Sequence, residues 1–461
     1  MPHLTIAVIG AGFSGTLMAL HLLRRCSPGT QVILLERNGQ FGRGQAYATG
    51  NPNHLLNVPA ARMSAFHDRP EDFLHWLQRQ PDGEALAAQG FVPRRLFGAY
   101  VRALLHEEVM RPATECRLEL LRGDVLGLAK SETGLTLALD GERWLAADLA
   151  VLAIGNFPPE APPGLPRRFL ESPLYRPDPW APEAFAGLPP AAPVLLIGTG
   201  LTMVDGVVSL LDQGHRGPIH ALSRRGLLPR RHAPAPPQPR PATPPLPPSL
   251  LGLARSLRAE ARRAEAEGGD WRPVVDRLRP FTQDVWQSLS AEDKARFLRH
   301  LRPWWDVHRH RMAGSVADRV EAARASGQLR LHTGRIRGVE EMEGVAELCF
   351  ARRGDGALQS LRAARVVNCA GPGADYDRIE HPLVRGLLQA GLARPDPLRL
   401  GLDVTANCAL RDRQGGISRR LFAIGPVTKG AFWEMTAVPD IRRQCEVVAE
   451  HLAGIMKAMS A

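Results

Sequence analysis

The 461-residue sequence contains few lysines, no closely spaced pair of cysteines and no long hydrophobic run. None of its six cysteines belongs to a Cys-x-x-Cys pair, so the sequence predicts neither a zinc site nor a dithiol redox centre, and we expect no metal. Scattered cysteines favour a reducing cytoplasm as the location of the protein. Because no run of about 20 uninterrupted apolar residues is present, we also expect no membrane span.

The net charge of +11 rests on 58 basic residues, of which only Lys130, Lys294, Lys429 and Lys457 are lysines. An arginine surplus beside abundant alanine, proline and glycine favours genomic base composition as its cause. A basic chain can also attract phosphates, nucleic acid or acidic substrates, so position has to decide which arginines matter. The hydrophobic share of 44% and the charged share of 23% are ordinary for a globular protein, which excludes disorder throughout.

The N-terminal residues carry the pattern of a dinucleotide-binding βαβ unit. A short apolar run leads into Gly10, Gly12 and Gly15, spaced as G-x-G-x-x-G, and a helical pattern follows over residues 16–25. The second strand of this unit ends at Glu36. The first glycine makes a tight turn, the second admits a pyrophosphate and the third lets the helix pack closely on the strand. The helix N-terminus adds free N–H groups and a partial positive charge for the phosphate.

The same pattern returns in the middle of the chain. The apolar residues 194–197 lead into Gly198 and Gly200, and a helical pattern follows, although Met203 replaces the third glycine. Two dinucleotide sites in one chain are typical of a flavoprotein that takes hydride from a nicotinamide, with FAD on the first site. A protein with two NAD molecules is less plausible, because it would lack an acceptor for the electrons.

The residue at the end of the second strand distinguishes the two units. Arg224 follows Gly198 at the spacing by which Glu36 follows the first glycine of its own unit, so we expect both at the same position. A carboxylate there accepts hydrogen bonds from ribose hydroxyls, whereas an arginine binds a 2′-phosphate. The sequence therefore predicts FAD in the first unit and NADPH in the second, with further phosphate contacts from Ser223 and Arg225. The alternative is that these arginines are surface residues of an arginine-rich chain.

Further motifs precede and follow the second unit. They read Gly42-Arg43-Gly44-Gln45-Ala46-Tyr47, His54-Leu55-Leu56-Asn57-Val58-Pro59, Met63-Ser64, Pro93-Arg94-Arg95-Leu96-Phe97, Gly425-Pro426 and Trp433-Glu434-Met435-Thr436-Ala437. With these motifs the chain resembles the two-dinucleotide-binding flavoproteins. Within that group it is similar to the class B flavin monooxygenases, in the motif order of the amine N-hydroxylating enzymes. The resemblance covers nearly the whole chain.

The resemblance implies roles for several of these residues. It implies that Asn57, Met63 and Ser64 line the flavin, and that the strand end at Gly425 and the segment after it close the flavin site. The chain departs from the family pattern in having Gly425-Pro426 where Gly-Asp is usual. The fingerprint of Baeyer–Villiger enzymes is also absent from the sequence, which favours heteroatom oxygenation over carbonyl insertion.

The cofactor-binding residues expected from both arguments form one set. It comprises Gly10, Gly12, Phe13, Ser14, Gly15, Glu36, Arg37, Arg43, Gly44, Asn57, Met63, Ser64, Gly155, Gly198, Gly200, Leu201, Thr202, Ser223, Arg224, Arg225, Gly425, Thr436 and Ala437. Asn57 and Arg309 are the candidates for a catalytic role. In the segment 304–312, Arg309 or Arg311 holds an acidic substrate or a cofactor phosphate, or the segment is a solvated basic helix end with tryptophan in the core. We favour the second interpretation.

The predicted fold class is α/β, with two Rossmann-like dinucleotide-binding domains and a helical insertion. The FAD-binding domain is expected over residues 1–190 and 372–461, and the NADPH-binding domain over residues 191–371. The latter contains a proline-dense connector, residues 233–249, within an insertion that spans residues 233–325.

The main hypothesis for function is an FAD-dependent, NADPH-using monooxygenase. The family resemblance implies that it uses molecular oxygen and a flavin C4a-hydroperoxide to oxygenate a small molecule, with an amine nitrogen as the expected target. One alternative is a flavin reductase or oxidase that passes electrons to quinone, a protein or oxygen. Another is a nucleotide-binding redox sensor without turnover. We expect neither nucleic acid nor a membrane as partner, and the substrate and oligomeric state stay open.

Overall fold

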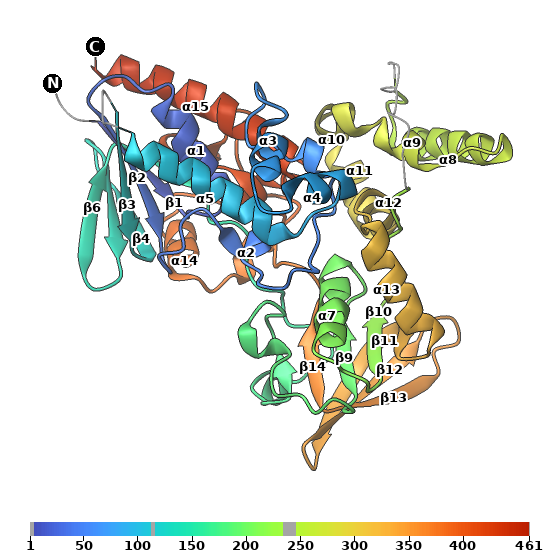
Figure 1. Cartoon of the computed structure of the whole chain (residues 1–461). Coiled ribbons are helices and arrows are strands. Elements are labelled where there is room, and N and C mark those ends of the chain that lie inside the picture. Colours follow the sequence, from blue (N-terminus) through green and yellow to red (C-terminus); the bar gives the residue numbers. More distant parts are fainter. Residues whose placement is uncertain (1–3, 112–115, 234–245, 461) are drawn as a thin grey trace. The chain divides into compact units, whose positions relative to one another are not determined.

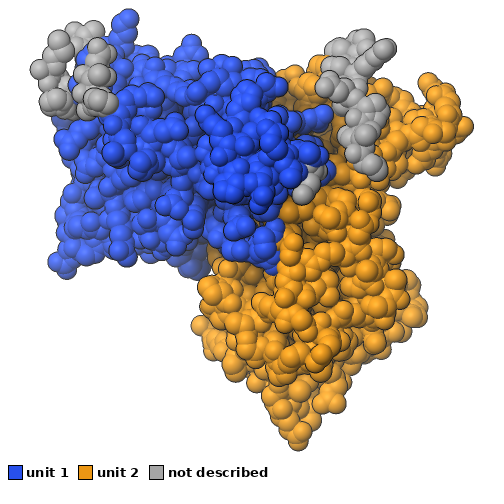
Figure 2. Space-filling view, in the orientation of Figure 1, with its two compact units in different colours: residues 1–52, 58–157, 374–461 blue, residues 53–57, 158–373 orange. Residues whose placement is uncertain are grey.

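The computed structural model describes residues 4–111, 116–233 and 246–460. The chain divides into two compact units, shown as ribbons in Figure 1 and in two colours in Figure 2. Unit 1 comprises residues 1–52, 58–157 and 374–461, and unit 2 comprises residues 53–57 and 158–373. Residues 234–245, which make up most of the predicted proline-dense connector, lie outside the described residues.

Unit 1 is built on a six-stranded sheet in the order β15-β16-β7-β1-β2-β3. Neighbouring strands run parallel except for the antiparallel pair β15 and β16. Its central strands are apolar and buried, as is typical of a parallel sheet covered on both faces. The strands are β1 (Thr5–Ile9), β2 (Thr30–Glu36), β3 (Cys116–Arg122), β7 (Leu149–Leu152), β15 (Ala409–Arg411) and β16 (Ile417–Ala423).

Different layers cover the two faces of this sheet (Figure 1). One face packs against a small antiparallel sheet, β4 (Val125–Lys130), β5 (Leu135–Leu139) and β6 (Arg143–Ala147), and against α14 (Pro382–Gln389). The other face carries α1 (Phe13–Leu23), which contacts α5 (Arg94–Met110) and α15 (Val438–Ser460). The remaining helical turns are α2 (Gly44–Tyr47), η1 (Ala60–Arg62), α3 (Asp72–Gln78), α4 (Gly83–Gln89), η5 (Tyr376–Arg378) and η6 (Gly425–Thr428).

Unit 2 is built on a seven-stranded sheet in the order β13-β12-β11-β10-β9-β14-β8. The strands from β11 to β8 run parallel, and β11, β12 and β13 form an antiparallel meander at the other edge. The strands are β8 (Tyr175–Arg176), β9 (Val194–Ile197), β10 (Ile219–Ser223), β11 (Leu329–Met342), β12 (Val345–Arg352), β13 (Leu358–Ala363) and β14 (Arg365–Asn368). The helix α7 (Leu201–Asp212) connects β9 to β10 and contacts α13 (Gly314–Ala325).

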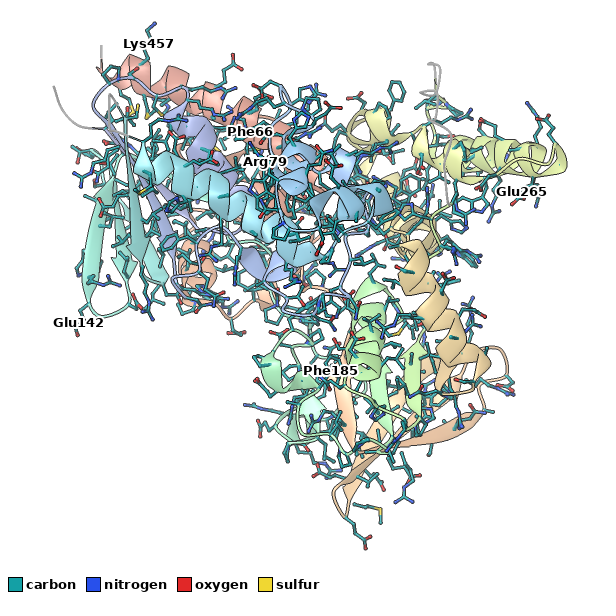
Figure 3. All side chains as sticks on the ribbon, viewed as in Figure 1. Phe66, Arg79, Glu142, Phe185, Glu265 and Lys457 are labelled. Carbon is teal, nitrogen blue, oxygen red and sulfur yellow. The ribbon has the colours of Figure 1, made fainter. Side chains whose placement is uncertain are left out.

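The helical insertion of unit 2 lies between β10 and β11 in the sequence. It comprises α8 (Leu250–Ala266), α9 (Arg272–Asp276), η3 (Arg279–Phe281), α10 (Thr282–Ser288), α11 (Ala291–Arg296), the π-helical turn η4 (Phe297–Leu301), α12 (Arg302–Arg309) and α13. Its apolar cluster is small, and only Leu250 and Leu253 of α8 are buried, whereas Glu265 (Figure 3) is exposed. In contrast, Phe66 of unit 1 and Phe185 of unit 2 are buried in their own units.

The predicted α/β fold with two Rossmann-like domains and a helical insertion is confirmed. The predicted domain end at residue 190 is wrong, because unit 1 already ends its middle segment at Phe157. The proline-containing stretch after Phe157 forms α6 (Arg167–Leu170), β8 and η2 (Pro182–Ala184), and β8 pairs with β14. This stretch therefore completes the second sheet. The second boundary lies at residues 373 and 374, close to the predicted one.

Three further findings concern the cysteines, metal sites and membrane-spanning helices. All six cysteines are free thiols. Among the described residues, no group of three or more His, Cys, Asp or Glu side chains is arranged to hold a metal ion. No helix within the described ranges is long and apolar enough to cross a membrane.

Candidate functional site

The glycine loop of unit 1 joins β1 to α1 and can be built only from glycine at two positions. Gly10 has φ +101°, and a Cβ there would lie 2.5 Å from the carbonyl oxygen of Ala153. A Cβ at Gly15 would lie 1.7 Å from the carbonyl oxygen of Gly10. The helix therefore begins close against the turn, and its first N–H groups face the end of the sheet where parallel α/β folds bind ligands.

Glu36 lies at the edge of this loop. The Gly10 N–H donates to the carbonyl oxygen of Leu35 over 3.0 Å, which places Glu36 level with the first glycine. Its carboxylate accepts the N–H of Ala11 (3.1 Å) on one oxygen and the N–H of Asn38 (3.1 Å) on the other. Each carboxylate oxygen has a further acceptor site for a ribose hydroxyl. Arg37, the next residue, is exposed.

A second glycine-rich turn, at residues 42–44, packs against the first. The N–H of Gly42 donates to the carbonyl oxygen of Ala11 over 2.9 Å. A Cβ at Gly44 would lie 3.1 Å from the Cα of Gly12, so the two turns touch through their backbones. Arg43 lies between the two glycines of the second turn and caps α2. The turn therefore places Arg43 in the sequence directly between two glycines that border the loop expected to hold a pyrophosphate.

The C-terminal part of unit 1 returns to the same helix start. Gly425 has φ +74°, and a Cβ there would lie 2.6 Å from Oγ of Ser14 in the first turn of α1. Its N–H donates to Oε1 of Gln444 on α15 over 2.7 Å. Thr436 and Ala437 lie just before α15, and Thr436 is exposed. The end of the strand, α15 and the glycine loop therefore meet at the start of α1.

The other predicted residues of unit 1 have different surroundings. Phe13 packs on Phe97, with ring centroids 5.5 Å apart, so it has a packing role at the start of α1. Gly155 follows β7 with φ +68°, and a Cβ there would meet no described atom within 4 Å. Met63 is buried. Ser64 has no exposed surface, and its hydroxyl donates to the carbonyl oxygen of Arg69 over 2.5 Å, so Ser64 builds its own loop.

The glycine loop of unit 2 repeats the turn of unit 1. Gly198 has φ +113°, and a Cβ there would lie 2.4 Å from the carbonyl oxygen of Cys369, which corresponds to Ala153 in the first loop. A Cβ at Gly200 would meet no described atom within 4 Å, which leaves open space at the start of α7. Leu201 and Thr202 form the first turn of that helix. The loop fits a pyrophosphate approached by backbone N–H groups.

The strand register shows which residue of β10 is level with Gly198. The N–H of Gly198 donates to the carbonyl oxygen of Leu222 over 2.8 Å, so Ser223, and not Arg224, is level with the first glycine. The predicted equivalence of Arg224 and Glu36 is therefore wrong, because the second unit is one residue shorter between its glycine and its strand end.

Ser223, Arg224 and Arg225 have different surroundings at the end of β10. Ser223 Oγ accepts the N–H of Gly226 (2.9 Å) and lies 2.9 Å from Oγ1 of Thr199. Arg224 follows the strand and is exposed, and Arg225 donates to the carbonyl oxygen of Arg299 over 3.4 Å. A neutral serine thus replaces the carboxylate, with two guanidiniums directly after it. This exchange removes the negative charge that would repel a 2′-phosphate.

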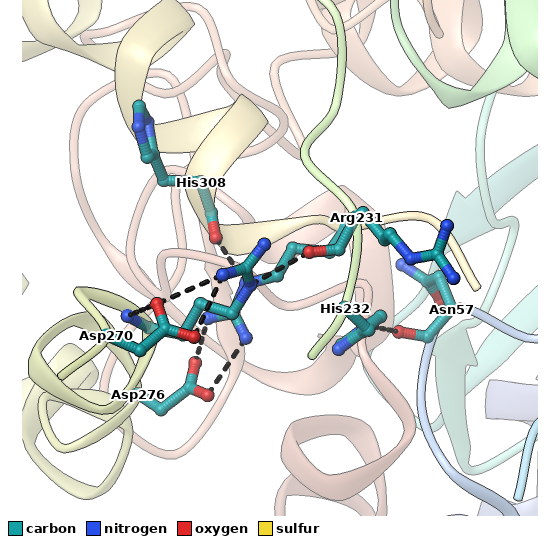
Figure 4. A network of polar contacts seen from close by, with 8 residues as sticks. Asn57, Arg231, His232, Asp270, Asp276 and His308 are labelled. Atoms are coloured by element: carbon teal, nitrogen blue, oxygen red, sulfur yellow. Dashed lines mark hydrogen bonds and ion pairs between the residues drawn. The ribbon is translucent and has the colours of Figure 1, made fainter. Parts of the chain in front are cut away.

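The segment 304–312 differs from the favoured prediction of a solvated basic helix end. Arg311 is 2% exposed and makes a bidentate ion pair with Asp276, and its Nε donates to the carbonyl oxygen of His308 over 2.7 Å (Figure 4). Of the two tryptophans in the segment, Trp304 is 42% exposed, whereas Trp305 is partly buried and packs against the apolar cluster of the insertion. A buried guanidinium that is neutralised by its own carboxylate is not available to hold an acidic substrate. Arg309 ends α12 and is partly buried.

The comparison with protein families gives one match. Residues 7–157 match the model of the FAD-NAD(P)-binding family. The matched residues include the glycine loop of unit 1 and Glu36. A comparison with curated proteins gives no match.

Solved structures share the fold over essentially the whole chain. The ornithine N-hydroxylase of Kutzneria sp. 744 has a TM-score of 0.68 at 13% identity, with 100% of both chains covered. The cadaverine monooxygenase DfoA of Erwinia amylovora has a TM-score of 0.67 at 14% identity, with 98% of this chain and 94% of that chain covered. The bacillithiol disulfide reductase of Staphylococcus aureus has a TM-score of 0.56 at 10% identity, with 98% and 99% covered.

Proposed function

We propose that this chain, an α/β protein with an FAD-NAD(P)-binding domain, is an FAD-dependent, NADPH-using monooxygenase that oxygenates the amine nitrogen of a small molecule. In this proposal unit 1 binds FAD and unit 2 binds NADPH. When bound, FAD accepts hydride from the reduced nicotinamide and activates molecular oxygen. A cytoplasmic location is part of the same proposal.

The observation that carries the proposal is the difference between two otherwise similar loops. Both loops turn at a glycine with positive φ against the carbonyl oxygen of a neighbouring strand. The first has the carboxylate of Glu36 level with that glycine, and the second has Ser223 there with Arg224 next. One loop is therefore suited to a free ribose, and the other to a ribose that carries a 2′-phosphate.

The residues of unit 1 then have separate tasks toward FAD. The N-terminus of α1 and Arg43 bind the pyrophosphate, and Glu36 accepts the ribose hydroxyls. Gly425 leaves room beside Ser14 for the chain to close over the start of α1. In unit 2 the N-terminus of α7 binds the pyrophosphate of NADPH, and Arg224 and Arg225 pair with its 2′-phosphate.

The amine as target rests on the fold comparison and the family motifs. The structures with the higher TM-scores in the comparison are named an ornithine N-hydroxylase and a cadaverine monooxygenase. The disulfide reductase has the lower TM-score. In addition, no Cys-x-x-Cys pair occurs in this sequence to serve as a dithiol centre. These observations favour an oxygenase over a disulfide reductase.

The experiment is a screen of small amines with the FAD-loaded protein, NADPH and ¹⁸O₂. We expect one class of amine to raise NADPH consumption and to appear as a hydroxylated product with one ¹⁸O atom. A protein that consumes NADPH but yields only hydrogen peroxide with every amine would be a flavin oxidase. One that binds both nucleotides without turnover would be a sensor, and either result would overturn the proposed oxygenase.

A further inference from the structure

The segment Asn53–Asn57, which contains the first four residues of the family motif that begins at His54, belongs to unit 2, although the chain on both sides of it belongs to unit 1. The segment is short and is bounded in the sequence by Pro52 and, two residues beyond its end, by Pro59. Proline fixes φ near −65°, so the chain has little freedom at either end of this stretch. Asn53, His54 and Asn57 each take part in hydrogen bonds within unit 2.

The start of the segment is fixed to α7. Asn53 donates through Nδ2 to Oδ1 of Asp212 over 3.0 Å. Nε2 of His54 lies 3.1 Å from the carbonyl oxygen of Asp205 and 3.0 Å from Oγ of Ser209. The three helix residues are four and three positions apart, which places them along one face of α7. His54 is only 6% exposed, so its own two hydrogen bonds are largely shielded from water.

The His54 ring is also enclosed by an aromatic side chain. Trp180 meets it edge to face, with ring centroids 6.2 Å apart and planes at 90°. Within unit 2, a buried imidazole with hydrogen bonds to a helix and an aromatic wall has a defined orientation. His54 is therefore a firm anchor for the first half of the segment.

The end of the segment is fixed by His232. Its Nε2 lies 3.0 Å from the carbonyl oxygen of Asn57 (Figure 4). Burial lowers the pKa of His232 from 6.5 to about 4, so the ring is neutral near pH 7. A carbonyl oxygen only accepts, so Nε2 carries the ring hydrogen and donates it.

The backbone around His232 is itself held by the helical insertion. The N–H of His232 donates to the carbonyl oxygen of Met312 over 2.9 Å, and Arg231 forms a bridge with the same residue. The carbonyl oxygen of Arg231 accepts from Nε of Arg272 over 2.9 Å. Next to Met312 in the chain is Arg311, whose ion pair with Asp276 is buried. His232, the second anchor, therefore belongs to a network of polar contacts that connects the helical insertion to the segment Asn53–Asn57.

The helix that holds the first anchor is also the helix that begins at Gly200. On the proposed function, its N-terminus binds the pyrophosphate of NADPH. We propose that His54 and His232 are positioning residues that hold Asn53–Asn57 on unit 2, so that NADPH bound at the start of α7 fixes this segment and the motif residues that follow it. The segment thus links pyridine nucleotide binding to the stretch that contains Met63 and Ser64.

The experiment compares FAD-loaded wild-type protein with His54→Leu and His232→Leu. Leucine is similar in size to histidine, but its side chain has no N–H group to donate a hydrogen bond. His54→Gln and His232→Gln are the rescue variants, because the glutamine amide can place a donor near the position of Nε2. His215→Gln is the matched control, since His215 is a buried histidine of unit 2 whose backbone carbonyl accepts from Gln328, outside the segment.

Two readouts are measured. The first is hydrogen exchange of the peptide that covers Asn53–Asn57, with and without NADP⁺. The second is the rate of anaerobic flavin reduction as a function of NADPH concentration. We expect NADP⁺ to slow exchange in wild-type protein about tenfold, an effect that corresponds to a free energy of the order of 1.4 kcal/mol. In the leucine variants this protection is lost and the limiting reduction rate falls about tenfold, while the Kd of NADPH changes less.

The outcomes separate this inference from the proposed function. Recovery in the glutamine variants and wild-type behaviour of His215→Gln support the inference. Leucine variants that are reduced at the wild-type rate and keep the NADP⁺-dependent protection would overturn it and leave the proposed function intact. Wild-type protein that NADPH does not reduce would overturn the proposed function itself. If one leucine variant does not fold, the other tests the opposite end of the same segment.

Discussion

At Gly10 and at Gly198 the backbone makes the same turn, but the helices that follow pack differently. In unit 1 the third glycine, Gly15, is held against the carbonyl oxygen of Gly10, and no Cβ fits between them. In unit 2 the same place in the pattern is occupied by Met203, which is fully buried. Both loops therefore need a glycine at the first position, Gly10 or Gly198. Only the loop of unit 1 needs one at the third position, where Gly15 contacts the backbone of Gly10.

A second difference lies at the strand ends. Glu36 bonds to the backbone of its own loop, and Ser223 does the same through its hydroxyl. One unit presents a carboxylate and the other presents a hydroxyl followed by exposed Arg224. Similar backbones can thus select different nucleotides through the charge of one position and of the residue after it.

The largest effect is expected from a substitution at Gly15, the third glycine of the loop in unit 1. Gly15→Ala puts a Cβ 1.7 Å from a backbone oxygen, so the helix must shift. We expect a loss of more than about 3 kcal/mol of folding free energy and the loss of FAD from the purified protein. Denaturant unfolding and the flavin content per chain measure both effects.

Gly200→Ala is the matched control for that variant. Its Cβ would meet no described atom within 4 Å, so unit 2 should keep its stability while the added methyl group hinders a pyrophosphate. Equal destabilisation by the two alanine variants would contradict the packing difference between the loops.

The next effect concerns the 2′-phosphate. Arg224→Ala removes an exposed guanidinium that makes no hydrogen bond within the described parts of the chain, so the fold should not change. A charge-assisted hydrogen bond contributes roughly 1.5–3 kcal/mol, so we expect the KM for NADPH to rise about 10- to 100-fold. The KM for NADH should stay nearly constant.

Ser223→Glu sharpens the same test. It installs the carboxylate of the first loop at the level of Gly198, where it would repel a 2′-phosphate and accept ribose hydroxyls. NADPH should become the poorer donor and NADH the better one. A variant that keeps the wild-type preference would show that this position does not select the nucleotide.

A smaller effect is expected at Glu36. Glu36→Gln keeps the size of the side chain and an acceptor for the N–H of Ala11, but it removes the negative charge. We expect FAD affinity to fall about tenfold with little change in NADPH affinity. Fluorescence titration of the apoprotein with FAD measures the first quantity. A fall in NADPH affinity of the same size would contradict the assignment of the two loops.

The smallest expected effect is a difference between the two units in their stability at low pH. Burial lowers the pKa of five histidines in unit 2, to about 4 for His220 and His232, but that of only His21 in unit 1 among the described residues. A folded pKa below the unfolded value of 6.5 means that the unfolded chain binds more protons, so stability falls as the pH drops from about 6.5 to about 4. Unit 2 should therefore lose hydrogen-exchange protection at a higher pH than unit 1. Equal loss in both units would contradict this expectation.

The sequence was sufficient for the features that short-range rules determine. Gly10 and Gly198 could be predicted because a turn with positive φ between a buried strand and a helix needs glycine. The predicted equivalence of Arg224 and Glu36 failed because counting along the chain cannot detect a connection that is one residue shorter. Only the strand register reveals that Ser223 is level with the glycine.

Features that depend on distant partners could not be predicted. Arg311 was expected in a solvated segment because nothing near it in the sequence indicates that Asp276 would neutralise it in the interior. Residues 158–190 were expected in the FAD-binding domain, because nothing near β8 in the sequence indicates that it would pair with β14 of unit 2. The attachment of His54 to α7 joins residues about 150 positions apart, and no local pattern signals it.

The most direct test of the account is one anaerobic absorbance titration with NADPH, carried out on wild-type protein and on Gly200→Ala. We expect both proteins to bind one FAD per chain. NADPH should bleach the flavin band near about 450 nm in the wild type, and in the variant only at much higher concentration. A wild-type protein that binds no FAD, or a variant that loses its FAD while its NADPH dependence stays unchanged, would contradict the assignment of FAD to unit 1 and NADPH to unit 2.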